Sequence, residues 1–168
     1  MIKERLYSLQ MKMGFPDHDY RSRSLIIKTL RKYRHKIMRV FEYGSGNSTR
    51  YYPKKLYRLK QNFIWIAAEH CLKWEQKGQK SIQSFPNVFI YHKELVDDYV
   101  MFIKLFPRFD VVIIDGRYRR RCLGIAKDCL MQGGIVILHD AERKYYHCGL
   151  KGYKETDFAS NTRVYCNA

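Results

Sequence analysis

The sequence predicts an α/β fold with an open, doubly wound and mostly parallel sheet that ends in a C-terminal antiparallel hairpin. Segments with the character of strands alternate with segments of helical periodicity, which is typical of a sheet covered by helices on both faces. The predicted strands are largely apolar, as buried parallel strands are, and most of them end in, or are followed directly by, a polar or acidic residue: 38–43, 63–69, 87–92, 109–114 and 133–138. Residues 153–167 contain two further extended pieces around Ala159-Ser160-Asn161, which indicates a terminal hairpin.

The part of the chain before the first strand divides into two. Residues 1–22 mix methionines, aromatic residues and bases, with a break at residues 14–17, and we interpret them as a lid or a flexible lead. Ser24 is a candidate N-cap for a helix that follows. The apolar residues of this helix share one face: Leu25, Ile26, Leu30 and Tyr33. With 168 residues, the chain is expected to form a single domain.

Helices are expected between the strands. The first begins over residues 48–52, and because proline breaks a helix outside its first turn, we expect it to be short or to restart at Pro53 and run to Leu59. Three further helices are expected, the last of which ends at Gly133-Gly134, where the next strand starts: 72–80, 94–105 and 119–131.

The stretch over residues 40–49 predicts a strand that runs into a glycine turn and then into a helix. Gly44 and Gly46 lack the Cβ atoms that would keep a ligand away from the backbone, and they allow positive φ. The next three residues are good N-cap residues, so free N–H groups are expected to point into the turn, where a carboxylate or phosphate would rest. The candidate binding residues here are Glu42, Gly44, Ser45, Gly46, Asn47 and Ser48.

Acidic residues and a histidine follow the other strands. Glu69 ends the second strand and is suited to holding ribose hydroxyls. Asp115 follows the strand over 109–114, and His139-Asp140 follow the strand over 133–138. An imidazole, with an ordinary pKa of about 6.5, suits a general base, and Asp140 would orient it or contact a substrate. Because adjacent residues of a strand point to opposite faces, we expect only one of the two to reach a substrate.

Taken in order, these segments resemble the class I S-adenosylmethionine-dependent methyltransferases. The resemblance covers roughly residues 25–140 and is carried by Glu42-x-Gly44-x-Gly46, Glu69, residues 110–115 and residues 133–138. It implies a Rossmann-like fold and S-adenosylmethionine as the cofactor, bound by the glycine turn, Glu69 and Asp115. Residues 114–117 with Cys122, and residues 139–143 with Tyr145, also resemble small methyltransferases that act on sugars, among them plant xylan glucuronic acid O-methyltransferases and domains beside viral and bacterial glycosyltransferases.

The narrower resemblance implies a sugar hydroxyl of a glycan as the methyl acceptor, with Asp115, His139 and Asp140 as the catalytic residues. Asp115 and Asp140 also match, by position, the acidic metal ligands of catechol-type O-methyltransferases, where two carboxylates and waters hold a divalent metal such as Mg²⁺. The chain departs from that pattern, because the Asp-Asn pair of those enzymes is Asp140-Ala141 here.

Basic and aromatic residues near the same strand ends are candidates for binding the acceptor. Arg117 and Arg143 are suited to clamping a carboxylate or phosphate. The ring of Tyr145 is a stacking surface for sugars and for bases alike, so it does not distinguish between these two acceptors.

The chain is strongly basic, with 32 Lys and Arg against 16 Asp and Glu and a net charge of +16. Residues 1–40 hold eleven of the bases and three acids, and four arginines cluster over residues 117–121. The positive electrostatic field of such a chain favours the binding of polyanions, namely nucleic acid, an anionic membrane face or an acidic glycan. A surface that only keeps the protein in solution explains the charge equally well.

The five cysteines show no C-x-x-C spacing, so we expect a reducing compartment, with Cys122 and Cys129 acting as small apolar residues. The sequence shows neither an apolar signal core nor an apolar run of membrane-spanning length. We therefore expect a soluble, cytoplasmic protein, and the resemblance to domains of viral enzymes leaves a viral origin open.

Two other functions stay open at this point. The charge favours an RNA methyltransferase, but the Asn/Asp-Pro-Pro-aromatic motif of base-methylating relatives is absent. A Lys-Asp-Lys-Glu set for ribose methylation assembles only loosely, from Asp115, Lys144 or Lys151, and Glu155. The other is a basic module that binds nucleic acid without catalysis, against which the paired glycines, Glu42 and Glu69 argue.

Overall fold

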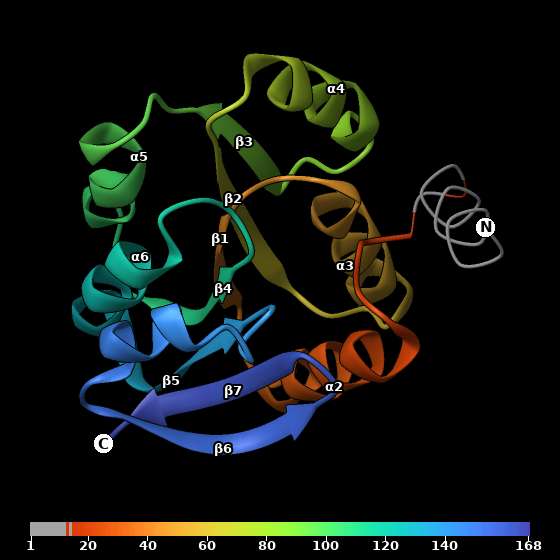
Figure 1. Cartoon of the computed structure of the whole chain (residues 1–168). Helices are drawn as coiled ribbons and strands as arrows, with labels where there is room; N and C mark the ends of the chain where they lie inside the picture. The colour runs from red at the N-terminus through yellow and green to blue at the C-terminus, as the bar shows by residue number, and fades with distance from the viewer. Residues whose placement is uncertain (1–12, 14) are drawn as a thin grey trace, which may run out of the picture.

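The computed structural model, which describes residue 13 and residues 15–168, contains one seven-stranded sheet with helices on both faces (Figure 1). The strands are β1 (Met38–Tyr43), β2 (Phe63–Glu69), β3 (Val88–His92), β4 (Phe109–Ile114), β5 (Leu130–Leu138), β6 (Tyr153–Ala159) and β7 (Thr162–Asn167). The helices are α2 (Tyr20–Leu30), α3 (Asn47–Arg58), α4 (Leu72–Ile82), α5 (Asp97–Met101) and α6 (Arg119–Ala126). Short 3₁₀ helices are η1 (Arg31–Tyr33), η2 (Phe102–Leu105), η3 (Lys127–Cys129) and η4 (Lys144–Leu150).

The strand order is β3-β2-β1-β4-β5-β7-β6. The first five strands in this order run parallel to one another, whereas β7 is antiparallel to both β5 and β6. The predicted fold class, a mostly parallel sheet with a C-terminal antiparallel hairpin, is therefore confirmed. The order of the strands reverses between β1 and β4, which is where open sheets of this type bind ligands.

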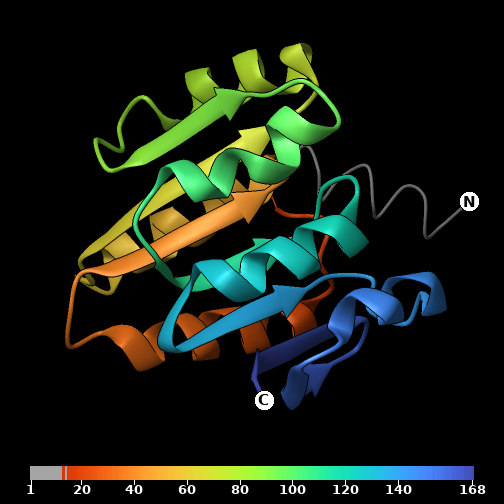
Figure 2. The ribbon, with the colours of Figure 1, turned by 90° about the vertical axis from the view of Figure 1, so that its left-hand side faces the viewer.

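The sheet separates two apolar cores (Figure 2). Helices α2, α3 and α4 cover one face, where Ile26, Leu56 and Ile82 pack against the strands. Helices α5 and α6 cover the opposite face, where Tyr99 and Leu123 are buried. Since the central strands are buried on both faces, they carry apolar residues at consecutive positions, such as 111–114 of β4, rather than at alternate positions.

Helix α2 begins at Tyr20, four residues before the predicted start near Ser24. The carboxylate of Asp19 accepts a hydrogen bond from the Ser22 N–H at 2.8 Å and caps the helix. The predicted start was wrong because Asp19 lies beyond the apolar pattern on which the prediction was based.

Helix α3 continues through Pro53, so the predicted break at this residue does not occur. Proline lacks the N–H that would bond to the carbonyl one turn earlier. Tyr52 and Leu56 are fully buried beside Pro53, and their packing against the sheet offsets the missing hydrogen bond.

The predicted helix over residues 119–131 is too long. Helix α6 ends at Ala126, and β5 already begins at Leu130. The pairing of β4 with β5 shifts between Phe109, opposite Leu130, and Val111, opposite Ile135, so the intervening residues of β5 form a bulge. Gly133 has φ +74° within this bulge, a conformation that glycine adopts without strain. The glycine pair therefore bends a strand and does not end a helix.

The terminal hairpin and the buried, unpaired Cys122 and Cys129 agree with the sequence analysis. The predicted lid lies partly outside the described residues, which include only residue 13 and residues 15–22 of that segment. Among the helices that the structure describes, none has both the length and the apolar character needed to cross a bilayer.

Candidate cofactor and catalytic site

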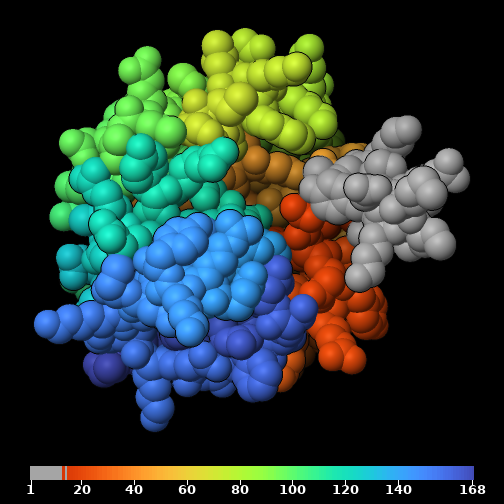
Figure 3. All heavy atoms as spheres, in the orientation of Figure 1, coloured from red at the N-terminus to blue at the C-terminus, as the bar shows by residue number. Residues whose placement is uncertain are grey.

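The carboxyl ends of four parallel strands meet at one edge of the sheet. Tyr43 of β1 is paired with Ala68 of β2 and with Ile114 of β4, and Ile114 is paired with Leu138 of β5, so the loops that follow start at one level. A cleft of about 710 Å³ opens over these loops. Figure 3 shows segments of this edge on one face of the molecule: α4 in yellow-green, the loop before α6 in teal and η4 in light blue. The volume is within the range of small-ligand sites, about 300–1,000 Å³.

The sequence analysis located most of the lining of this cleft. All the predicted site residues except Glu42 line it: Gly44, Ser45, Gly46, Asn47, Ser48, Glu69, Asp115, Arg117, His139, Asp140, Arg143 and Tyr145. Trp74 of α4 also lines the cleft and was not predicted. The structure thus brings together residues from five separate stretches of the chain.

The glycine turn after β1 requires glycine at Gly44. Its φ is +88°, and a Cβ atom there would lie 2.6 Å from the Cα atom of Gly116. The Gly44 N–H donates to the carbonyl of Ala68 at 2.8 Å. The turn is therefore fixed between the end of β2 and the loop that follows β4, with no side chain in the narrow space between them.

Glu42 lies beneath the turn and is fully buried. Its carboxylate accepts hydrogen bonds from Ser48 Oγ at 2.6 Å, Thr49 Oγ1 at 2.7 Å and Trp65 Nε1 at 2.8 Å. Burial raises the pKa of Glu42 to about 7, although the three hydrogen bonds act in the opposite direction. Glu42 therefore ties β1 to the first turn of α3 and to β2, and does not itself line the cleft.

Glu69 reaches across to the glycine turn. Its Oε2 atom accepts hydrogen bonds from the N–H of Ser45 at 2.8 Å and from Ser45 Oγ at 3.2 Å. Its Oε1 atom accepts from the N–H of Cys71 at 2.9 Å and lies 3.0 Å from His70 Nδ1. Each carboxylate oxygen has two lone pairs, so Oε2 is fully engaged, whereas Oε1 accepts one hydrogen bond and retains capacity for a ligand in the cleft.

Arg119 lies between the two carboxylates that the sequence analysis expects to share a divalent metal. Its guanidinium is 3.2 Å from Asp115 Oδ1 and 3.3 Å from Asp140 Oδ2. It also donates to the carbonyls of Gly116 at 2.9 Å and His139 at 2.5 Å. Positive charge is thus already present between Asp115 and Asp140, and the guanidinium braces the loops after β4 and β5.

His139 and Asp140 both face the cleft, contrary to the expectation that only one of them would. The strand ends at Leu138, and Asp140 has φ +52°, so the alternation of a strand no longer applies. His139 Nε2 lies 3.2 Å from Asp140 Oδ1. Burial lowers the pKa of His139, which favours the neutral imidazole. Burial acts to raise the pKa of Asp115, but His18, His139 and Arg119 outweigh it and lower that pKa.

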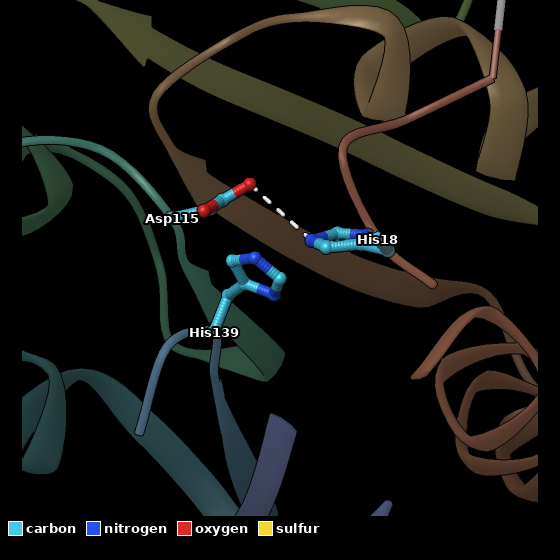
Figure 4. Close-up of side chains that lie close together, drawn as sticks. All are labelled: His18, Asp115 and His139. Carbon is cyan, nitrogen blue, oxygen red and sulfur yellow. Dashed lines mark ion pairs between the residues drawn. The ribbon is translucent and has the colours of Figure 1, made fainter. Parts of the chain in front are cut away.

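His18 completes the site from the loop before α2, as Figure 4 shows. Its Nδ1 atom lies 2.5 Å from Tyr52 Oη, its Nε2 atom lies 3.3 Å from Asp115 Oδ2, and its ring is 4.2 Å from the ring of His139. No local pattern in the sequence pointed to His18. Arg119 follows Asp115 by four residues, but Asp115 lies before α6, so the spacing of ion pairs along a helix did not identify this contact either.

No family model matches the sequence, and no curated protein is significantly similar to it. Solved structures are similar in fold. One is an O-methyltransferase from Bacillus cereus in complex with SAH, with a TM-score of 0.69 and 12% identity over 96% of this chain and 88% of that chain. Another is a methyltransferase from Geobacter sulfurreducens, with a TM-score of 0.68 and 10% identity over 98% of this chain and 87% of that chain. This protein has the methyltransferase fold.

A third similar structure is the ribosomal protein L11 methylase from Lactobacillus delbrueckii subsp. bulgaricus, with a TM-score of 0.62 and 10% identity over 88% of this chain and 78% of that chain. The three proteins share the methyltransferase fold with this chain. None of their descriptions names a sugar as the acceptor, so the narrower resemblance to sugar methyltransferases stays a prediction.

Proposed function

We propose that the protein transfers a methyl group from S-adenosylmethionine to a hydroxyl oxygen. The observation that carries this proposal is the pairing of the glycine turn at Gly44 with the carboxylate of Glu69, at the edge of a methyltransferase-fold sheet. The N–H groups of Gly44, Ser45 and Gly46 are paired within the protein, but the two glycines carry no side chain, so the amino acid end of the cofactor can approach the backbone of the turn and the start of α3. Glu69 lies at the tip of the neighbouring strand, where an acid holds the ribose hydroxyls.

In this assignment Glu42 is a positioning residue. Its hydrogen bonds to Ser48 and Thr49 hold the first turn of α3 against the end of β1. The cofactor would meet a preformed turn and would not have to order it, which lowers the cost of binding.

The reaction needs a base beside the acceptor. The acceptor oxygen attacks the methyl carbon, the bond from sulfur to that carbon breaks, and the hydroxyl proton passes to a base. We assign proton removal to His139 and Asp140, which lie 3.2 Å apart at the end of β5. Asp115, at the end of β4, faces the same part of the cleft and carries negative charge next to the positively charged sulfur.

For the acceptor we propose a sugar hydroxyl of an acidic glycan. Arg117, Arg143 and Tyr145 line the cleft, and the Tyr145 side chain is 63% exposed. An exposed ring is a stacking surface for a sugar, and guanidinium groups bind a carboxylate or phosphate. RNA is the second candidate, because the net charge of +16 favours any polyanion.

The test is transfer of a labelled methyl group to a panel of acidic glycans, neutral glycans and RNA. The sugar assignment predicts label on acidic glycans, and loss of at least about tenfold in kcat/KM when Arg117 and Arg143 are both replaced by Gln. Label on RNA, together with RNA binding that weakens steeply as the salt concentration rises, would identify RNA rather than a sugar as the acceptor. Absence of label on every acceptor, from a protein that binds the cofactor, would refute both assignments.

A further inference from the structure

Three side chains that are remote in sequence converge behind the cleft (Figure 4). His18 comes from the loop before α2, Asp115 from the end of β4 and His139 from the end of β5. One nitrogen or oxygen atom of each residue lies within 4.8 Å of the corresponding atoms of the other two. Two of the residues also line the cleft, so the cluster adjoins the place where the acceptor is proposed to bind.

His18 has an unsatisfied buried nitrogen that points into this cluster. The residue is 2% exposed, and its Nε2 atom has no hydrogen-bond partner. Asp115 Oδ2 is 3.3 Å away but outside hydrogen-bond geometry. Its neighbour is thus an ion-pair partner that forms no hydrogen bond with it, and a buried polar atom without a hydrogen bond is uncommon, so the position of this nitrogen requires an explanation.

The surrounding contacts orient the three groups toward one another. Tyr52 Oη binds Nδ1 of His18 at 2.5 Å, and Thr162 Oγ1 lies 3.3 Å from Nδ1 of His139. In the tautomer that carries its proton on Nδ1, each imidazole would present the Nε2 lone pair to an ion, and such contacts fix the orientation of metal-binding histidines. Arg119 occupies Oδ1 of Asp115, and Oδ2 faces His18. The cluster therefore has both the ligand atoms and the outer contacts of a metal site.

We propose that His18, Asp115 and His139 bind one divalent first-row transition metal ion, of the class of Zn²⁺, Co²⁺, Mn²⁺ or Fe²⁺. Two imidazoles and one carboxylate are the donor set that such ions prefer, whereas Mg²⁺ prefers oxygen ligands. Ligand atoms at about 2.0–2.2 Å from a shared ion are about 3–3.5 Å from one another. The contact of His18 with Asp115, at 3.3 Å, already meets this condition, and the ligand atom of His139, which lies within 4.8 Å of the other two, would move closer on binding.

This site differs from the magnesium site expected at Asp115 and Asp140, where the Arg119 guanidinium lies. Asp140 adjoins this site without being part of the cluster, because its Oδ1 atom is 3.2 Å from His139 Nε2. The histidine from the loop before α2 is the ligand that selects a transition metal.

The consequence for catalysis rests on the proposed function. Three protein ligands leave coordination positions open for the oxygen of the acceptor. A metal ion lowers the pKa of a bound hydroxyl group, and His139 with its Nε2 atom on the ion no longer accepts a proton. Asp140, which adjoins His139, would then accept the hydroxyl proton of the acceptor. Metal binding itself requires neither cofactor nor acceptor.

The experiment is a calorimetric titration of the tag-free protein with Co²⁺, Zn²⁺ and Mg²⁺, in the absence of cofactor. The proposal predicts one Co²⁺ or Zn²⁺ per chain and no measurable binding of Mg²⁺. His18→Gln and His139→Gln should each weaken Co²⁺ binding at least about tenfold, since each removes one of three ligands. His35→Gln, at an exposed histidine just before the start of β1 and hence at the opposite end of the strands from the cluster, should leave the affinity unchanged.

Two results would overturn the proposal: no Co²⁺ or Zn²⁺ bound by the folded wild type, or the same affinity in the His18→Gln variant. Should the glutamine variants fail to fold, X-ray absorption of the Zn²⁺-loaded wild type decides. A spectrum that shows two imidazole ligands and oxygen ligands would support the proposed site. Sulfur ligands would show that the ion is bound by cysteines and would contradict the proposal. A protein that binds SAH but no transition metal would refute this proposal and leave the proposed cofactor site standing.

Discussion

Glu69 Oε2, at the end of β2, accepts a hydrogen bond from the N–H of Ser45 in the glycine turn after β1, at 2.8 Å. The bond joins the tips of two adjacent strands and orients the carboxylate along the wall of the cleft. Since Glu69 is 3% exposed, its position is set before any ligand arrives. The relationship explains why the turn and the acid, which are 24 residues apart, lie side by side in the lining of the cleft.

Glu69→Gln tests this surface. The amide keeps the size of the side chain but removes the charge that strengthens hydrogen bonds to ribose hydroxyls, so the affinity for SAH should fall at least about tenfold. The measurement is calorimetry with SAH. Asp128→Asn removes an exposed acid from η3 and should leave the affinity unchanged. Equal affinity in Glu69→Gln and wild type would exclude Glu69 from the cofactor site.

Gly44→Ala should destabilise the protein and weaken SAH binding. The added Cβ atom meets the backbone of Gly116 at 2.6 Å, and alanine is strained at φ +88°, so the free energy of unfolding should fall by about 2 kcal/mol or more. Urea denaturation measures this change. Gly124→Ala is the matched control, because nothing lies within 4 Å of its Cβ position in α6, and there alanine should stabilise by about 0.5–1 kcal/mol. Similar losses in both variants would contradict the account of the turn.

Glu42 should make stability depend on pH. Its pKa is raised from 4.5 to about 7 by burial, so the folded state holds a proton that the unfolded chain has already released. The stabilisation from Glu42 is complete below pH 4.5 and is lost as the pH rises to about 7, by about 3 kcal/mol in total.

Glu42→Gln removes this titration. Urea denaturation across the same pH range should show a smaller decrease in the free energy of unfolding for the variant than for the wild type. Parallel curves for the two proteins would mean that Glu42 stays ionised in the folded state.

Arg119→Lys should be strongly destabilising, although it conserves charge. The Arg119 side chain is 10% exposed and bridges the loops after β4 and β5 through Asp115 and Asp140. An ammonium group cannot match its planar array of donors, so the expected loss is about 2–4 kcal/mol. Arg121→Lys alters an exposed pair with Asp97 and should cost less than about 0.5 kcal/mol. Denaturation curves that shift equally would show that the bridge is not structural.

The sheet could be predicted because its strands are recognisable in the local sequence, as apolar runs followed by polar residues. The same runs located Gly44, Glu69, Asp115 and His139, since the carboxyl ends of parallel strands meet at one edge. Features that depend on long-range packing could not be predicted. The bulge of β5 at Gly133 depends on its pairing with β4, and the local sequence resembles the end of a helix.

The roles of two site residues could not be predicted from the sequence, because they too depend on long-range packing. Glu42 has the position of a ligand-binding acid in the sequence, but Trp65 from the neighbouring strand and the hydroxyls of α3 enclose it. His18 reaches Asp115 and His139 only because the loop before α2 folds against the end of the sheet. Neither contact has a signature within a short window of sequence.

The most direct test of the central claim is a calorimetric titration of the wild-type protein with SAH. We expect saturable binding of one SAH per chain, with a Kd on the order of micromolar, or about −8 kcal/mol. The absence of heat at millimolar SAH, together with an unchanged melting temperature of the folded protein, would show that the cleft at Gly44 and Glu69 does not hold the cofactor.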